Sequence, residues 1–153
     1  MDPVTILTVE KITPDNVAAT CQLAVQPHQK KFVAPVAVSL AEAYTQPDIA
    51  WPRVIVADGE PVAFVMGRFD PAAEFDFFRC GIWRLNVGAC VQGRGYGRFA
   101  VETVLDEARR RGEKVATVLW LPGDDGPERF YLKLGFRPTG QTHHGEVVGR
   151  IEL

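Results

Sequence analysis

The sequence has few cysteines and almost no net charge, and each shortage excludes a class of protein. Its three cysteines, Cys21, Cys80 and Cys90, form no CxxC pair, which argues against a disulfide framework and a structural zinc site. Seventeen basic and nineteen acidic residues leave a net charge of −2, so no strong positive field is present to hold nucleic acid. We therefore expect no metal and no nucleic-acid partner.

Long hydrophobic runs are also missing. No stretch approaches the roughly 20 apolar residues of a membrane span, and residues 1–4 lack the basic-then-apolar pattern of a signal peptide. We therefore expect a cytoplasmic protein without a membrane partner. Its 153 residues are 46% apolar, which is enough for one core of ordinary size, so a single domain over residues 1–153 is expected.

Turn signals and hydrophobic periodicity predict alternating strands and helices. Strands are predicted at 4–9, 53–57, 61–69, 77–87 and 114–120, with one or two more around a turn at 143–145. Helices are predicted at 14–25, from a capping box at Ser39, at 96–111 and from Pro127 to about Leu134. Asp58-Gly59 predicts a hairpin, and Gly81 is a candidate bulge. This order predicts an α+β fold with a mixed, mostly antiparallel central sheet flanked by about four helices.

A glycine-rich loop precedes the longest predicted helix. It reads Gln92-Gly93-Arg94-Gly95-Tyr96-Gly97, and Arg98 follows it. Glycines let the backbone approach a ligand closely, and a helix start presents unpaired N–H groups, so the loop suits an anion such as a phosphate. A flexible turn is the alternative. The P-loop ending Gly-Lys-Ser/Thr is missing, and a Rossmann pattern over residues 95–100 lacks the acidic residue after the next strand.

This loop resembles the Q/R-x-x-G-x-G/A pyrophosphate loop of the GNAT acyltransferase superfamily. Residues 130–136, FYLKLGF, resemble the same family's F-Y-x-x-L-G-F segment, and the element order also matches. The resemblance implies a three-layer GNAT fold and direct transfer of an acetyl group from acetyl-CoA to a primary amine in a ternary complex, without a metal. It also implies cofactor contacts, with the pantetheine arm along Leu85, Asn86 and Val87, and the pyrophosphate at Gln92, Gly93, Arg94, Gly95, Tyr96, Gly97 and Arg98.

Further along, Asp124, or its neighbour Asp125, occupies a position where many family members have Asn. It is a candidate either for the pantetheine amides or for a helix cap.

Tyr131 is the candidate catalytic residue, because the family places this tyrosine beside the CoA sulfur. Phe130 and Leu134, four residues apart, are predicted to form the core face of their helix and to turn Tyr131 toward the cleft. The alternative is that Tyr131 only packs a short helix on the sheet.

No general base is evident in the sequence. Residues 77–88 contain no carboxylate, so Glu74, Asp76 or a water chain are the candidates. His143, His144 and Glu146 suggest metal ligation only superficially and are interpreted as a solvated turn.

The acceptor is predicted from a second resemblance. Residues 28–44 resemble the N-terminal segment of bacterial spermine and spermidine acetyltransferases, although Val36 stands where that subgroup has Asn. Residues 42–76 carry seven acidic residues against two arginines, which suits a cationic amine, whereas residues 93–111 carry five arginines against three acidic residues. A small amine, with a polyamine as the leading case, is therefore the expected acceptor. Peptide, protein N-terminal or lysine acetylation and a non-catalytic CoA-binding sensor are the alternatives, and the family resemblance also suggests a homodimer.

Overall fold

The computed structural model describes residues 4–153, so the interpretation of residues 1–3 as lacking a leader pattern lies outside it. One seven-stranded sheet has the order β1-β2-β3-β4-β5-β7-β6, and only the β4–β5 pair is parallel. The predicted mixed, mostly antiparallel sheet is therefore confirmed. The strands are β1 (Leu7–Glu10), β2 (Ala50–Ala57), β3 (Glu60–Phe69), β4 (Cys80–Val87), β5 (Val115–Trp120), β6 (Arg137–His143) and β7 (Glu146–Glu152).

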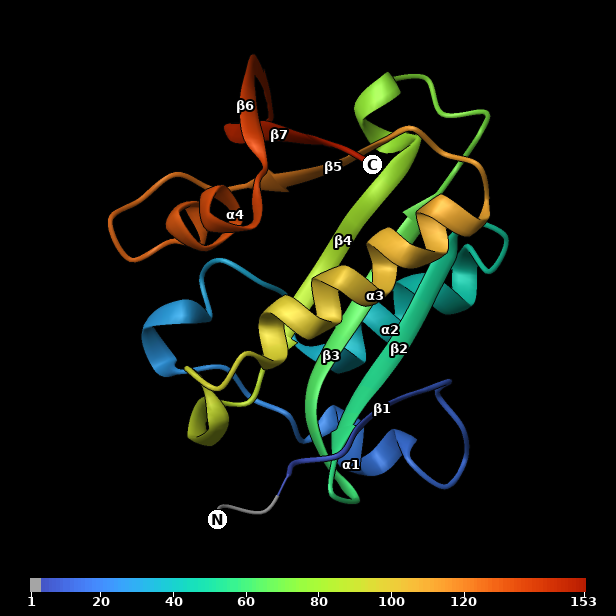
Figure 1. Ribbon diagram of the computed structural model, residues 1–153, viewed down its shortest axis with the longest axis vertical. Helices are drawn as coiled ribbons and strands as arrows, with labels where there is room; N and C mark the ends of the chain where they lie inside the picture. The colour runs from blue at the N-terminus through green and yellow to red at the C-terminus, as the bar shows by residue number, and fades with distance from the viewer. Residues whose placement is uncertain (1–3) are drawn as a thin grey trace.

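Helices cover both faces of this sheet (Figure 1). They are α1 (Val17–Cys21), α2 (Val36–Thr45), α3 (Tyr96–Arg110) and α4 (Glu128–Leu134). Helix α3 crosses one face of β2, β3 and β4, with α1 and α2 behind the same strands. The predicted apolar face of α3 is confirmed, because its members are fully buried in the core: Ala100, Val101, Val104, Leu105 and Ala108. None of the helices described over residues 4–153 is long and apolar enough to cross a membrane.

Two tight turns join antiparallel strands as the sequence predicts. In the β2–β3 hairpin Asp58 and Gly59 have φ of 49° and 87°, and in the β6–β7 hairpin His144 and Gly145 have φ of 49° and 81°. Positive φ at both central residues matches the right-handed twist of the flanking strands. The turn predicted at residues 143–145 is thus confirmed, and of the one or two strands predicted around it the structure has two.

The first two helices differ from their predictions. The helix predicted over 14–25 is shorter in the structure, where it comprises only α1. Its start is delayed by a turn, because the Asn16 side chain accepts a hydrogen bond from the Thr13 N–H and donates one to the Lys11 carbonyl. The predicted start at Ser39 is also wrong. Helix α2 begins three residues earlier, Ser39 is fully buried inside it, and Glu42 reaches Arg84 rather than capping the helix.

The strand predicted from Phe77 begins at Cys80 instead. Residues 76–78 form a short 3₁₀ turn, because Phe75, Phe77 and Phe78 turn outward to pack around His143 with ring centroids 5.0–5.4 Å from it. The bulge predicted at Gly81 is wrong too, since the β3–β4 register shifts between Met66 and Gly67. The unpaired residue of β4 in that shift is Trp83.

Candidate active site

The candidate site begins where β4 and β5 separate. These parallel strands pair only at Gly81 with Thr117 and at Ile82 with Val118, and beyond this point they diverge (Figure 1). We call the opening between residues 83–87 of β4 and residues 119–121 the fork. On the fork side, residues 83–87 of β4 have no partner strand. This edge can therefore hydrogen-bond an extended ligand as a strand would.

Gly81 makes the close approach at the base of the fork possible. A Cβ atom at this position would lie 1.9 Å from the Thr117 carbonyl oxygen, so any side chain would force the strands apart. Thr117 completes the junction, because its hydroxyl donates to the Phe77 carbonyl at 2.6 Å and lies 3.2 Å from the Cys80 carbonyl. Gly81 therefore permits a close strand contact rather than a bulge.

A cavity of about 1000 Å³ opens from the fork. Segments far apart in the sequence line it, including the loop before α2, the β4 edge, the glycine loop and helix α4. The predicted site residues that line it are Leu85, Val87, Gln92, Gly93, Gly95, Tyr96, Gly97, Arg98 and Tyr131. The fold thus gathers most of them around one space.

The glycine loop forms one wall of the cavity. Gly93 and Gly95 have φ of 81° and 87°, a conformation that favours glycine, and Gly95 is the N-cap of α3. The first N–H groups of this 15-residue helix have no partner within it, so the wall presents donors and the positive helix end. Arg98 lines the cavity, whereas Arg94 is exposed and lies outside the lining.

Gln92 joins this loop to two other segments. Its Nε2 donates to Gln29 Oε1 at 2.7 Å and to the Val87 carbonyl at 3.1 Å, and Gln29 Nε2 donates back to Gln92 Oε1 at 3.1 Å. The paired amides hold the 27–29 turn against the end of β4. Gln92 therefore shapes the cavity as well as lining it.

Asn86 lies away from the cavity, unlike its neighbours Leu85 and Val87. It is 2% exposed, and its Nδ2 donates to the Ala34 carbonyl at 3.0 Å, which ties the loop before α2 to β4. Asp124 is also outside the cavity lining. The next residue, Asp125, lines the cavity instead. Of the predicted cofactor residues, the side chains of Asn86, Arg94 and Asp124 are the ones that the fold leaves out of the cavity.

Tyr131 belongs both to the core and to the cavity lining. Its ring stacks on Trp120 at 5.7 Å between centroids, and Phe130 and Phe136 pack against it edge-on. Phe130 and Leu134 pack against the core as half-buried residues and Tyr131 lines the cavity, both as predicted, but Tyr131 is also buried in the core, which the prediction did not include. Burial raises the pKa of Tyr131 well above its usual value, so the hydroxyl stays protonated at neutral pH.

One carboxylate reaches the cavity from an unexpected position. Glu74 and Asp76, the candidate bases, do not line it, whereas Asp125 and Glu146 do. Sequence reasoning missed Glu146 because its place depends on the pairing of β7 with β5, where Val147 lies opposite Trp120. Within residues 4–153, no group of three or more His, Cys, Asp or Glu side chains is arranged to hold a metal ion.

The chain is similar to one protein family in sequence and to several solved structures in fold. The family model described as Acetyltransferase (GNAT) family matches residues 18–136. No curated protein matches the sequence. Among solved structures, a domain from Methanocaldococcus jannaschii superposes with a TM-score of 0.75 at 17% identity, covering 98% of this chain and 100% of that one.

Two further solved structures share the fold. PaiA N-acetyltransferase from Thermoplasma acidophilum, in complex with coenzyme A, has a TM-score of 0.70 at 10% identity, covering 97% of this chain and 99% of that one. The ribosomal-protein-S18-alanine N-acetyltransferase from Escherichia coli has a TM-score of 0.68 at 16% identity, covering 96% and 94%. At these identities the structures establish the arrangement of elements alone.

Proposed function

Because the chain belongs to the GNAT acetyltransferase family and is an N-acetyltransferase that uses acetyl-CoA, we propose that it acetylates a primary amine of a small molecule, with a polyamine such as spermidine or spermine as the preferred acceptor. The observation that carries the proposal is the cavity itself. The glycine loop, the free β4 edge and Tyr131 line one space. This space could hold an anionic acyl-CoA beside the Tyr131 hydroxyl.

Acetyl-CoA fits the residues that line the fork. The backbone is open at Gly93 and Gly95, where a Cβ atom would have nothing within 4 Å, and this leaves room for a pyrophosphate beside the N–H groups of α3 and Arg98. The pantetheine arm would extend along Leu85 and Val87, whose strand edge is unpaired. Asn86 would support this arrangement by holding Ala34, whereas Arg94 and Asp124 lie outside the cavity lining and would not contact the cofactor.

Tyr131 would supply the proton that the departing thiolate needs. A thiol has a pKa near 8.5 and an ordinary tyrosine one near 10, and burial raises the pKa of Tyr131 further. The transfer is therefore uphill and occurs as the C–S bond breaks, not before. The Trp120 ring that supports Tyr131 is itself fixed, because its Nε1 donates to Glu128 Oε2 at 2.9 Å.

A second candidate acceptor is a peptide or protein amine. Arg84 lines the cavity and forms an ion pair with Glu42 at 3.2 Å. A guanidinium in the cavity favours an acceptor that carries a carboxylate or a peptide carbonyl near its amine, whereas Glu42 offsets this charge for a polyamine. The polyamine is preferred because residues 28–35 resemble the polyamine subgroup and residues 29–35 line the cavity.

The release of free CoA from acetyl-CoA tests the proposal. Purified protein is assayed with spermidine, spermine, amino acids, aminoglycosides and peptides with free N-termini. The highest kcat/KM is expected with spermidine or spermine, and a preference for peptides would replace that acceptor with the second candidate. CoA binding without turnover of any amine would make the chain a CoA sensor. The cytoplasmic location and the homodimer are further proposals, which fractionation of cells and sedimentation would test.

A further inference from the structure

We propose that Glu146 is the general base of this site and binds the acceptor ammonium before deprotonating it. This inference rests on the proposed function. It assigns a general base from β7, since β4 carries no carboxylate. Glu146 lines the cavity and is partly buried. Across residues 4–153 its carboxylate accepts no hydrogen bond and has no cationic nitrogen within 4.0 Å. An unpaired carboxylate facing a cavity is available to a cationic ligand.

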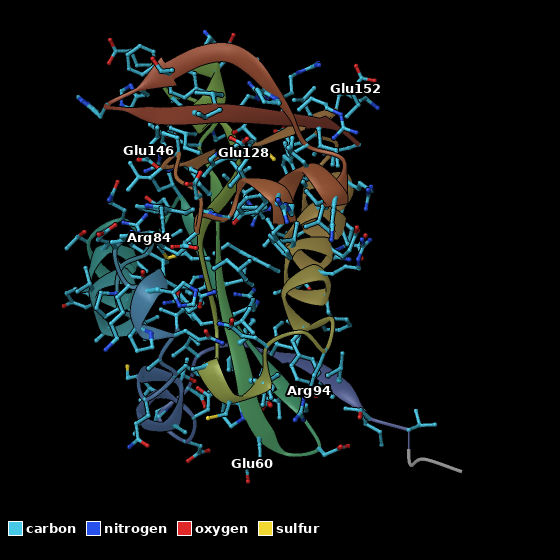
Figure 2. The ribbon with its side chains drawn as sticks, turned by 90° about the vertical axis from the view of Figure 1, so that its left-hand side faces the viewer. Glu60, Arg84, Arg94, Glu128, Glu146 and Glu152 are labelled. Carbon is cyan, nitrogen blue, oxygen red and sulfur yellow. The ribbon has the colours of Figure 1, made fainter. Side chains whose placement is uncertain are left out.

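The sheet places Glu146 on β7, next to the strand whose Trp120 ring packs on Tyr131. It is the first residue of β7, opposite His143 in the β6–β7 hairpin. The next residue, Val147, pairs with Trp120, whose ring stacks on Tyr131. Figure 2 shows Glu146 at one end of β7, on the side of Arg84, and Glu152 at the other end. Glu146 and Tyr131 therefore border the same cavity from neighbouring elements.

The other charged residues around the cavity do not fit this role. Asp125 is an exposed loop residue, and Glu42 lies behind Arg84, to which it is bound. His143, the register partner of Glu146, packs among three phenylalanine rings. Five cationic residues line the cavity: Lys30, Lys31, Arg84, Arg98 and Lys133. Glu146 is thus the partly buried carboxylate in the lining that is free to hold an ammonium group.

The proton balance assigns one task to each residue. An alkylammonium group with a pKa near 10.4 is neutral in about one molecule in 2,500 at pH 7, so attack requires a proton acceptor. Glu146 takes the first proton from nitrogen, and the nitrogen lone pair forms the C–N bond at the thioester carbon. The C–S bond breaks as Tyr131 gives its proton to sulfur, and the second nitrogen proton restores Tyr131. Glu146 then releases its proton to water.

The test compares Glu146→Gln with Glu146→Asp and with Glu152→Gln as a control. Glu152 is on the same strand, but it is exposed and lies near Arg150 at 3.6 Å, away from the cavity. With spermidine at pH 7, E146Q is expected to lower kcat/KM about 100-fold. The deficit should shrink below about tenfold near pH 9.5, where more of the amine is already neutral. E146D should retain part of the activity, and E152Q should match the wild type.

Two outcomes would overturn the inference. One is an E146Q profile within about twofold of E152Q at every pH, and the other is an equal loss at every pH, which a base would not produce. Calorimetric titration of spermidine into the CoA-loaded protein separates this result from failure of the proposed function. If the wild type acetylates no amine, the acceptor given in the proposed function is wrong. Spermidine binding that E146Q leaves unchanged would then reject the role of Glu146 as well, whereas binding that E146Q abolishes would support the ammonium contact.

Discussion

The two ends of the β4–β5 pair show how one sheet serves both stability and chemistry. At the closed end, Gly81 and Thr117 are in register, and the Thr117 hydroxyl links β5 to the carbonyls of Phe77 and Cys80. At the open end, the two strands diverge, and the space between them becomes the cavity. The tight junction therefore positions the free strand edge, because the two strands diverge from a fixed point.

The aromatic residues form two clusters with different roles. Phe75, Phe77 and Phe78, which precede β4, surround His143 and attach the β6–β7 hairpin to the rest of the sheet. Trp120, Tyr131 and Phe136 pack at the open end, and one member of this group carries a hydroxyl that burial keeps protonated. Packing at the first cluster is structural, whereas packing at the second also holds the hydroxyl that we propose as the proton donor.

Breaking the closed end should have the largest effect. Gly81→Ala places a Cβ atom 1.9 Å from the Thr117 carbonyl oxygen, so the strands must separate. We expect the free energy of unfolding to fall by roughly 3 kcal/mol or more, measured by urea denaturation. Gly140→Ala is the control, because nothing lies within 4 Å of its Cβ position and only its φ of 91° is unfavourable. Similar losses in the two variants would contradict a special junction at Gly81.

Removing the proposed proton donor should affect the open end alone. Tyr131→Phe keeps the packing on Trp120 but removes the hydroxyl, so kcat should fall about 100-fold while the affinity for CoA and the free energy of unfolding change little. Tyr44→Phe, at an 87% exposed position, is the matched control and should leave kcat unchanged. An unaffected kcat in Tyr131→Phe would remove this residue from the mechanism.

Loosening the wall of the open end should have a smaller effect on catalysis. Gln92→Ala removes the side chain that holds Gln29 and the Val87 carbonyl. We expect the KM for acetyl-CoA to rise about tenfold with kcat nearly unchanged, since one charge-neutral contact pair contributes on the order of 1 kcal/mol. Gln141→Ala, on exposed β6, should behave as the wild type in the same steady-state assay. A fall in kcat instead of a rise in KM would assign Gln92 to the chemical step.

Alkaline pH should weaken the closed end slightly. Burial raises the pKa of Cys80 to about 12, while the thiol of the unfolded chain titrates near 8.5. Above that lower value the folded state binds more protons than the unfolded state, so stability falls as pH rises. Between pH 9 and pH 10 the loss from this group is about 1 kcal/mol. Urea denaturation of Cys80→Ala should show a correspondingly flatter pH dependence, and an unchanged slope would contradict the assignment.

Local signals predicted a large part of the fold. The Asp58-Gly59 turn, the apolar face of α3 and the start of α3 beside the glycine loop all depend on neighbouring residues, and all are confirmed. The errors lie where distant contacts override local preference. The sequence around Glu42 predicts a helix cap, but its side chain binds Arg84, 42 residues away. The sequence around Phe77 predicts a strand, but its ring packs against His143.

The amino-acid sequence by itself determined the family of this protein and the two motifs that meet at its cavity, because both motifs are short runs with fixed spacing. The tertiary structure decided which side chains face that cavity. It placed Asn86 behind the strand, buried Tyr131 against Trp120 and brought Glu146 to the open end of the fork. The physical reason is that two long-range pairings, β4 with β5 and β5 with β7, set these positions, and strand register is fixed by packing across the whole sheet.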